Sequence, residues 1–215
     1  NIYSHNVYST NLTAAHVVVG GVDLTASPGK ILFVATNGDD ANTGALENNP
    51  FATVKHALSV ATPGTEIYVF PGTYTEVFPL TVPQGVTVRG TSTRAVSIQP
   101  TVGTQTSDAF LLNGETTISD FTVSGFYKPG YAFKFANNFK ITSRSPYMKN
   151  VSVITQGSTV RLGTAPADDP RGYLAGDAGR GAYIDGAVVN SASKEASMLF
   201  HSCTFICPGS RTIYM

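Results

Sequence analysis

The residues best suited to chemistry lie in the C-terminal third of the chain. Carboxylate and guanidinium groups gather there in a stretch that is also rich in Gly, Ala and Pro, namely Asp168, Asp169, Arg171, Asp177, Arg180 and Asp185. Two Asp side chains with an Arg could bind a sugar or a calcium ion. The alternative is a solvated loop whose local ion pairs contribute little. We take Asp168, Asp169, Arg171, Asp177 and Arg180 as candidate ligand-binding residues and assign no catalytic residue.

A cationic stretch lies just before these residues. Residues 121–167 contain no acid and six cations, which are Lys128, Lys134, Lys140, Arg144, Lys149 and Arg161. Among the cations stand Tyr127, Tyr131 and Tyr147, whose rings could stack on sugars. The stretch could therefore face an anionic polysaccharide or an acidic neighbouring subunit, and Tyr131 and Lys134 join the candidate ligand-binding residues. The alternative is an ordinary solvated flank.

Two further acidic positions favour structure over chemistry. A glycosidase on this kind of chain would need two carboxyl groups about 5 to 9.5 Å apart. Asp120 instead recurs as Asn150 and Ser202 in related segments, which favours a turn or a hydrogen-bond ladder. The run of Asp39, Asp40 and Asn42 superficially resembles a calcium loop but lacks the ligand spacing of an EF-hand. Asx-turn hydrogen bonding is the favoured role there.

The cysteines and histidines do not predict a metal site. Cys203 and Cys207 have only His201 nearby, whereas zinc usually takes four ligands. The even spacing would place both thiols on one face of a strand, so we expect two buried free thiols. The sequence shows no nucleophile motif and no phosphate-binding loop, and we predict neither a metal nor a cofactor.

The amino-acid composition limits the possible fold classes and binding partners. Only 13% of the 215 residues are charged, and Lys+Arg balance Asp+Glu at 14 each. This balance argues against a nucleic-acid binder, and no apolar run approaches the ~18 residues that a membrane span needs, so we expect no membrane insertion. The abundance of Gly, Pro and β-branched residues predicts an all-β chain of short strands.

A repeated pattern specifies the architecture. One apolar residue, two further residues, and then an apolar–polar–apolar triplet occur at Ile118–Val123, Met148–Val153 and Phe200–Phe205. A second motif precedes each copy, as Ala109-Phe110, Ala132-Phe133 and Ala182-Tyr183. Repeats at intervals of about 20 to 50 residues indicate stacked units, and short strands joined by bends predict a parallel β-helix. The longest interval contains an inserted loop at about residues 157–180.

The remaining elements complete the expected organisation. Thr53 can cap a short helix whose apolar residues Val54, Ala57, Leu58 and Ala61 form a single stripe. We expect residues 1–29 to be an extended lead-in for attachment and residues 30–215 to form the β-helix. Within it, residues 30–64 are the cap and residues 65–215 the rungs. We expect the chain to be a fragment of a longer protein that is truncated at its C-terminus.

The cap region carries a resemblance. The residues concerned are Phe33-Val34, Asn37–Gly44, Pro50–Val54, Ala57-Leu58, Pro63-Gly64-Thr65, Ile67–Val69, Pro71–Glu76 and Leu80–Val86. They resemble the opening segment of right-handed parallel β-helix proteins of the pectate-lyase-like class, in which the short α-helix caps the N-terminal end of the coil. This opening serves lyases, surface proteins and phage spikes alike, so it implies the fold and not an activity.

The rest of the chain is similar in texture to virion proteins of tailed phages, especially tail-fibre or baseplate-associated proteins of marine cyanophages. This resemblance implies a structural and adhesive component of a tail fibre, tailspike or baseplate appendage that attaches to a host surface. It further implies a homotrimer, contacts with other virion proteins and with host polysaccharide, and location in the virion. The sequence favours a non-enzymatic role. The alternatives are a polysaccharide lyase or glycoside hydrolase, and an adhesin that is secreted or displayed on a bacterial surface.

Overall fold

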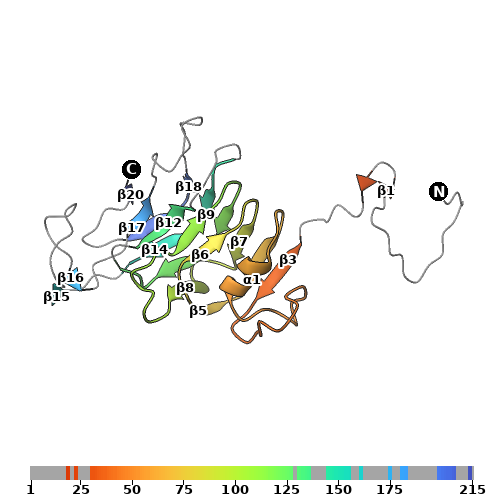
Figure 1. The fold of residues 1–215 in the computed structure, drawn as a ribbon, viewed down its shortest axis with the longest axis horizontal. Coiled ribbons are helices and arrows are strands. Elements are labelled where there is room, and N and C mark those ends of the chain that lie inside the picture. Colours follow the sequence, from red (N-terminus) through yellow and green to blue (C-terminus); the bar gives the residue numbers. More distant parts are fainter. Residues whose placement is uncertain are drawn as a thin grey trace, which may run out of the picture.

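The computed structural model describes residues 30–127, 130–136, 144–155 and 198–206 in full, and elsewhere the backbone of short strand segments. Within this part of the chain nearly all regular structure is β, with a single helix, α1 (Val54–Val60). Figure 1 shows the strands stacked side by side along the molecule, with α1 beside β3. None of the described helices has the length and apolar character needed to cross a bilayer.

The strands form three parallel sheets. In chain order, the first sheet comprises β3 (Ile31–Val34), β4 (Glu66–Val69), β7 (Thr87–Gly90), β10 (Thr117–Ser119), β13 (Tyr147–Lys149) and β18 (Leu199–His201). The second comprises β5 (Gly72–Glu76), β8 (Val96–Pro100), β11 (Thr122–Ser124), β14 (Ser152–Ile154) and β19 (Thr204–Ile206). The third comprises β6 (Leu80–Val82), β9 (Phe110–Leu112), β12 (Tyr131–Phe135), β17 (Arg180–Tyr183) and β20 (Ile213–Tyr214).

Each turn of the chain contributes one strand to each sheet, so β4, β5 and β6 form one rung and β7, β8 and β9 the next. Parallel strands of one sheet that are joined by such crossovers wind in the right-handed sense. The predicted right-handed parallel β-helix with a capping α-helix is therefore confirmed. Two short antiparallel pairs stand outside the coil: β1 (Val18–Val19) with β2 (Val22–Asp23), and β15 (Val160–Arg161) with β16 (Leu174–Ala175).

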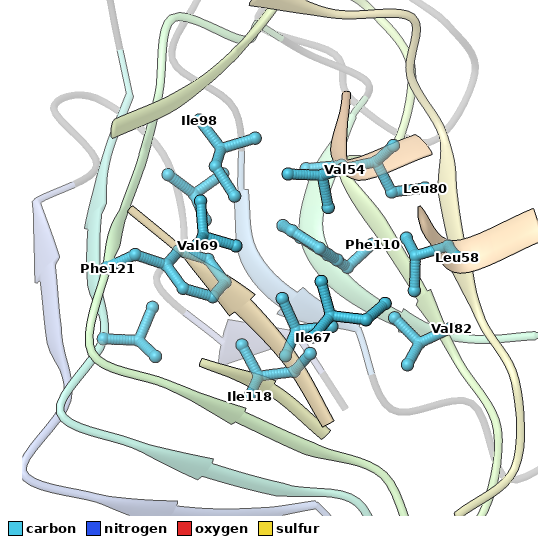
Figure 2. Close-up of a cluster of buried hydrophobic side chains, with 14 of the residues drawn as sticks. Val54, Leu58, Ile67, Val69, Leu80, Val82, Ile98, Phe110, Ile118 and Phe121 are labelled. Carbon is cyan, nitrogen blue, oxygen red and sulfur yellow. The ribbon is translucent and has the colours of Figure 1, made fainter. Parts of the chain in front are cut away.

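The interior is filled by the inward residues of all three sheets. Along the first sheet, Ile67, Val88, Ile118 and Met148 lie in register and are each fully buried. In Figure 2 the labelled side chains converge on one apolar centre, with Val54 and Leu58 of α1 among them. Burying an aliphatic or aromatic side chain of this size contributes about 1.5–3 kcal/mol. The coil is thus held together mainly by stacking each rung on the apolar face of the last.

Phenylalanine rings of the first and third sheets pack together in the interior. Phe110 and Phe133 of the third sheet are paired in register and their ring centroids lie 6.0 Å apart, while Phe133 lies 6.4 Å from Phe200 on β18 of the first sheet. The three Ala-aromatic motifs do not share one register. Phe133 pairs with Phe110, whereas Ala182 pairs with Phe133, so the third motif is shifted by one residue.

The repeated pattern marks a corner and not a continuous strand. Asp120, Asn150 and Ser202 separate the strands of the first and second sheets and have φ angles of 64°, 51° and 54°. This left-handed conformation is one that Asn and Asp tolerate better than most residues. The Asn150 side-chain amide donates to the Asp120 carboxylate at 2.8 Å. The predicted turn and ladder at Asp120 are therefore confirmed.

Thr53 and two carboxylates cap the N-terminus of the predicted helix. Thr53 is its N-cap, and its hydroxyl accepts a hydrogen bond from the His56 amide at 3.0 Å. Asp40 accepts from the Thr53 amide at 3.0 Å and from the Thr53 hydroxyl at 2.7 Å. Glu76 on β5 accepts from the amides of Val54 and Lys55 at 2.6 and 3.2 Å. These bonds satisfy amide groups that a helix N-terminus otherwise leaves without partners.

The acidic loop before the helix has a structural role, as predicted. Asp39 accepts a hydrogen bond from the amide of Ala41, two residues on, which is the geometry of an Asx-turn. Asn42 donates to the carbonyl of Pro50 at 2.8 Å and closes the loop. Among the described residues no group of three or more His, Cys, Asp or Glu side chains gathers where a metal ion could be held.

The two thiols do not both fall within the described structure. Cys203 is half-buried rather than buried and packs at the margin of the core, with its sulfur 3.4 Å from the Met148 carbonyl oxygen. The expectation of a buried thiol is therefore too strong for Cys203. Cys207 lies outside the described residues.

Candidate functional site

The entry corners of the first sheet share one conformation. Gly64 and Gly85 precede β4 and β7 with φ angles of 87° and 70°, and Glu115 precedes β10 with a φ of 60°. Their amides bond from rung to rung. Gly64 donates to Gly85 at 2.9 Å, Gly85 to Gly114 at 3.1 Å, and Glu115 to Arg144 at 2.7 Å. The corners therefore form a continuous column in which a glutamate replaces glycine at the third rung.

A groove of about 660 Å³ lies along this column, beside the first sheet. It is lined by residues of the corners and of the strands that follow them: Pro63, Gly64, Gly85, Glu115, Thr116, Thr117, Arg144, Ser145, Tyr147 and Leu199. Thr117, Tyr147 and Leu199 occupy equivalent positions on β10, β13 and β18. The groove thus follows the axis of the coil over several rungs, and its volume lies within the range of small-ligand sites.

The lining combines three kinds of recognition chemistry. Glu115 is exposed and can accept hydrogen bonds from hydroxyl groups, while Arg144 is exposed and can donate a bidentate pair to a carboxylate. Tyr147 is half-buried and supplies a ring with a polar tip. An acid, a guanidinium and an aromatic ring beside several hydroxyl groups suit a sugar chain better than an apolar ligand.

The neighbouring outward column of the first sheet continues the polar surface. Tyr68, Arg89, Ser119, Lys149 and His201 lie in register on successive strands. The Arg89 guanidinium lies over the Tyr68 ring, 4.8 Å from its centroid, and pairs with Glu66. Arg89 and Glu66 therefore neutralise each other, while Arg144 and Lys149 give the later rungs a positive character.

A smaller cavity of about 340 Å³ lies at the cap, lined by Asp40, Thr53, Lys55, His56, Ser59, Thr75, Glu76 and Val77. Its buried carboxylate belongs to Glu76, of which only 2% is exposed. Burial raises the pKa of Glu76 above its usual value, although the amides of Val54 and Lys55 act in the opposite direction. Because both carboxylates already bind the helix N-terminus, we assign this cavity to the structure of the cap.

Two of the predicted ligand residues lie on the third sheet, away from the groove. Tyr131 on β12 is buried, with 8% exposed, and its amide donates to the Asp108 carboxylate at 3.0 Å. Its ring therefore belongs largely to the interior. Lys134 on the same strand pairs with Asp108 at 3.2 Å and is half-buried. The structure does not bring Tyr131 and Lys134 to the same surface as Arg144 and Tyr147.

The other predicted ligand residues lie in or beside the inserted loop. Asp168, Asp169, Arg171, Asp177 and Asp185 are outside the described residues, and so are Lys128 and Lys140 of the cationic stretch. Arg180 and Arg161 begin and end described strands, but only their backbone is described. The candidate site in this loop therefore stays a prediction.

The groove was not predicted from the sequence, although part of its signal is visible there. Pro63-Gly64, Gln84-Gly85 and Gly114-Glu115 each stand just before a strand of the first sheet. Aligning the strands would have shown that Glu115 replaces a glycine. Arg144 and Tyr147 belong to the cationic stretch, and nothing local in the sequence places them in the same groove as Glu115.

Comparison with known proteins gives a family but no activity. A family described as a protein of unknown function, DUF1565, matches residues 36–161, which is more than half of the chain. Among solved structures, a rhamnogalacturonan lyase is similar with a TM-score of 0.38 and 18% identity. The similarity covers 82% of this chain and 51% of the lyase, so the chain spans about half the length of that structure. No curated protein matches.

Proposed function

This chain belongs to the DUF1565 family of proteins of unknown function, and we propose that it is a structural and adhesive β-helical rod that binds an anionic surface polysaccharide along its first sheet. The observation that carries the proposal is the groove that Glu115, Arg144 and Tyr147 line together. A parallel β-helix suits this role because its inward residues stabilise the coil, which leaves the outward residues free to form a long binding surface.

We place this rod in a tailed-phage appendage, that is, a tail fibre, tailspike or baseplate component that attaches to a host surface. Its support is the similarity in texture to tailed-phage virion proteins and the low-charge lead-in of residues 1–29. In that setting the rod would associate with copies of itself and with other virion proteins. The alternative location is a secreted or bacterial surface protein, and binding of an anionic polysaccharide would serve either.

The number of carboxylates in the groove favours binding over hydrolysis. Among the described residues that line it, Glu115 is the single carboxylate. Glycoside hydrolases generally use two carboxyl groups about 5 to 9.5 Å apart. The second candidate function is a polysaccharide lyase, for which the juxtaposition of Glu115 and Arg144 in one groove is the specific observation. A fall in the viscosity of the polymer would identify such an enzyme.

The experiment is a titration of the protein against anionic polysaccharides, with neutral dextran as the reference polymer. We expect saturable binding to an anionic polymer and about tenfold weaker binding for Arg144→Gln, which corresponds to about 1.4 kcal/mol. The matched control is Arg94→Gln, because Arg94 is also exposed but lies at a different corner of the coil. Equal losses for the two variants, or no preference for anionic polymers, would contradict the proposal.

A further inference from the structure

The outward face of the second sheet carries no charge. Its ten described outward positions are Thr73, Thr75, Ser97, Gln99, Thr122, Ser124, Ser152, Ile154, Thr204 and Ile206. By contrast, the first sheet presents Glu66, Arg89 and Lys149, and the third presents Lys134. Two copies of a neutral face can approach each other without the repulsion that like charges produce.

Several polar groups of this neutral face already have hydrogen-bond partners within the chain. Gln99 donates to the Thr75 hydroxyl at 3.2 Å, and the Ser97 and Ser124 hydroxyls lie 3.4 Å apart. The Thr122 hydroxyl donates to the carbonyl of Thr93 at 2.7 Å. Burying a polar group is costly mainly when it is left without a hydrogen bond. Covering this face therefore costs less than covering hydroxyl groups that depend on water.

An apolar seam borders the face at the end where its strands leave the sheet. Among the described residues eight large hydrophobic side chains are exposed, and half of them lie here: Val77, Val102, Ile154 and Ile206, at 48%, 93%, 40% and 48%. Ile154 and Ile206 end β14 and β19, and Val77 and Val102 follow β5 and β8. Parallel strands end at the same edge of a sheet, so the four residues lie along this edge as two pairs, with Ser124 of β11 between them.

We propose that the neutral face and the seam together form a self-association surface whose occupant is a second copy of this chain. Neutrality, internal hydrogen bonding and exposed apolar residues coincide on this face alone among the described parts of the three sheets. Two copies related by a twofold axis would place the same patch on both sides. Three copies around one axis would bring their seams together at its centre. The inference does not depend on what the groove binds.

The size of the face sets the expected strength. Five strands at a spacing of about 4.8 Å, with a mean length of about 12.5 Å, give an area of roughly 300 Å² for each copy. Stable complexes bury about 800 Å² for each partner. Association of this chain is therefore weak and depends on concentration, and every further rung with the same outward pattern would strengthen it.

The test is sedimentation equilibrium of the full chain from about 10 μM to about 1 mM, the concentrations that span weak association. The double variant Val102→Lys with Ile154→Lys places two cations on the seam. Its control, Leu46→Lys with Ile31→Lys, adds the same charge at exposed apolar residues of the cap loop and the first sheet, which are 60% and 43% exposed. Circular dichroism establishes that both variants are folded.

We expect the average mass of the wild type to rise with concentration, and the seam variant to dissociate at least tenfold more readily than the control. A wild-type chain that stays monomeric up to the highest concentration would overturn the proposal. So would an equal effect of the two variants. A monomer that binds neutral dextran, with loss of that binding in the seam variant, would assign the surface to a polysaccharide instead of a second copy.

Discussion

Glu115 stands where the two preceding rungs use glycine. We therefore predict that the residue at this position affects the stability of the fold and the affinity for ligand in opposite directions. Its φ of 60° lies in the left-handed region, as do those of Gly64 and Gly85. For an L-residue this conformation costs about 1–2 kcal/mol, whereas glycine adopts it freely. If the carboxylate is retained for the groove, replacing it with glycine will stabilise the fold and weaken ligand binding.

The magnitude follows from two opposing terms. Glu115→Gly removes about 1–2 kcal/mol of backbone strain but adds about 0.4–1 kcal/mol of unfolded-state entropy. The expected net gain is about 0.5–1 kcal/mol in the free energy of unfolding. For a domain of this size, that gain raises the melting temperature by about 1–4 °C. Glu115 is exposed, so removing its side chain leaves no cavity.

Urea unfolding and thermal melting measure the effect, and two controls separate its causes. Glu115→Gln keeps the strained backbone and removes only the charge, so its stability should match that of the wild type. Gly64→Ala is the reverse change in the same column. Its φ is 87° and nothing lies within 4 Å of the added Cβ. It should therefore lose about 0.5–1 kcal/mol of stability, because the strain outweighs the loss of unfolded-state entropy.

The reasoning fails if Glu115→Gly is less stable than the wild type by 1 kcal/mol or more, because the Glu115 side chain would then make a stabilising contact within the fold. It also fails if the glycine variant binds the anionic polysaccharide as tightly as the wild type. In that case the left-handed glutamate would serve neither folding nor recognition.

Two further predictions concern the core and the cap. Phe133→Ala removes a fully buried ring between Phe110 and Phe200, so it should lower the free energy of unfolding measured in urea by about 3–5 kcal/mol. The control Lys149→Ala, at an exposed residue, should lower it by no more than about 0.5 kcal/mol. Burial raises the pKa of Glu76 above 4.5, so the folded protein binds the proton more readily and its free energy of unfolding should rise as the pH falls from neutral towards 4.5. Urea unfolding at several pH values should show that Glu76→Gln removes this part of the pH dependence, and an unchanged slope would show that other groups cause it.

The fold could be predicted because its signals are local and repeated. The apolar residues of α1 and the corner residues Asp120, Asn150 and Ser202 specify their structures within a few positions of sequence. Strand alternation and the interval between copies then determine which side chains face inward. The motif does not reveal the one-residue shift of β17, because this strand follows the predicted insertion and an insertion frees the next strand to take a different register.

The groove could not be predicted with the same ease because its residues come from different rungs. Glu115 and Arg144 are 29 positions apart in the sequence, and only the rung-to-rung hydrogen bond joins their corners. Tyr131 shows the opposite case. It stands among cations in the sequence, yet strand alternation turns its side chain toward the interior. Surface chemistry on a β-helix is therefore specified by register, and local composition says little about it.

The same alternation separates the two surfaces proposed for this chain. The groove belongs to the first sheet and the neutral face to the second, while the stability of the coil rests on inward residues such as Ile118 and Val123. Substitutions at outward positions that share no contacts should act additively. Arg144→Gln should therefore weaken polysaccharide binding without changing self-association. The seam variant should weaken self-association without changing the affinity for a single short ligand. For a long polymer, loss of self-association should also reduce apparent affinity, because linked copies bind one chain at a raised effective concentration.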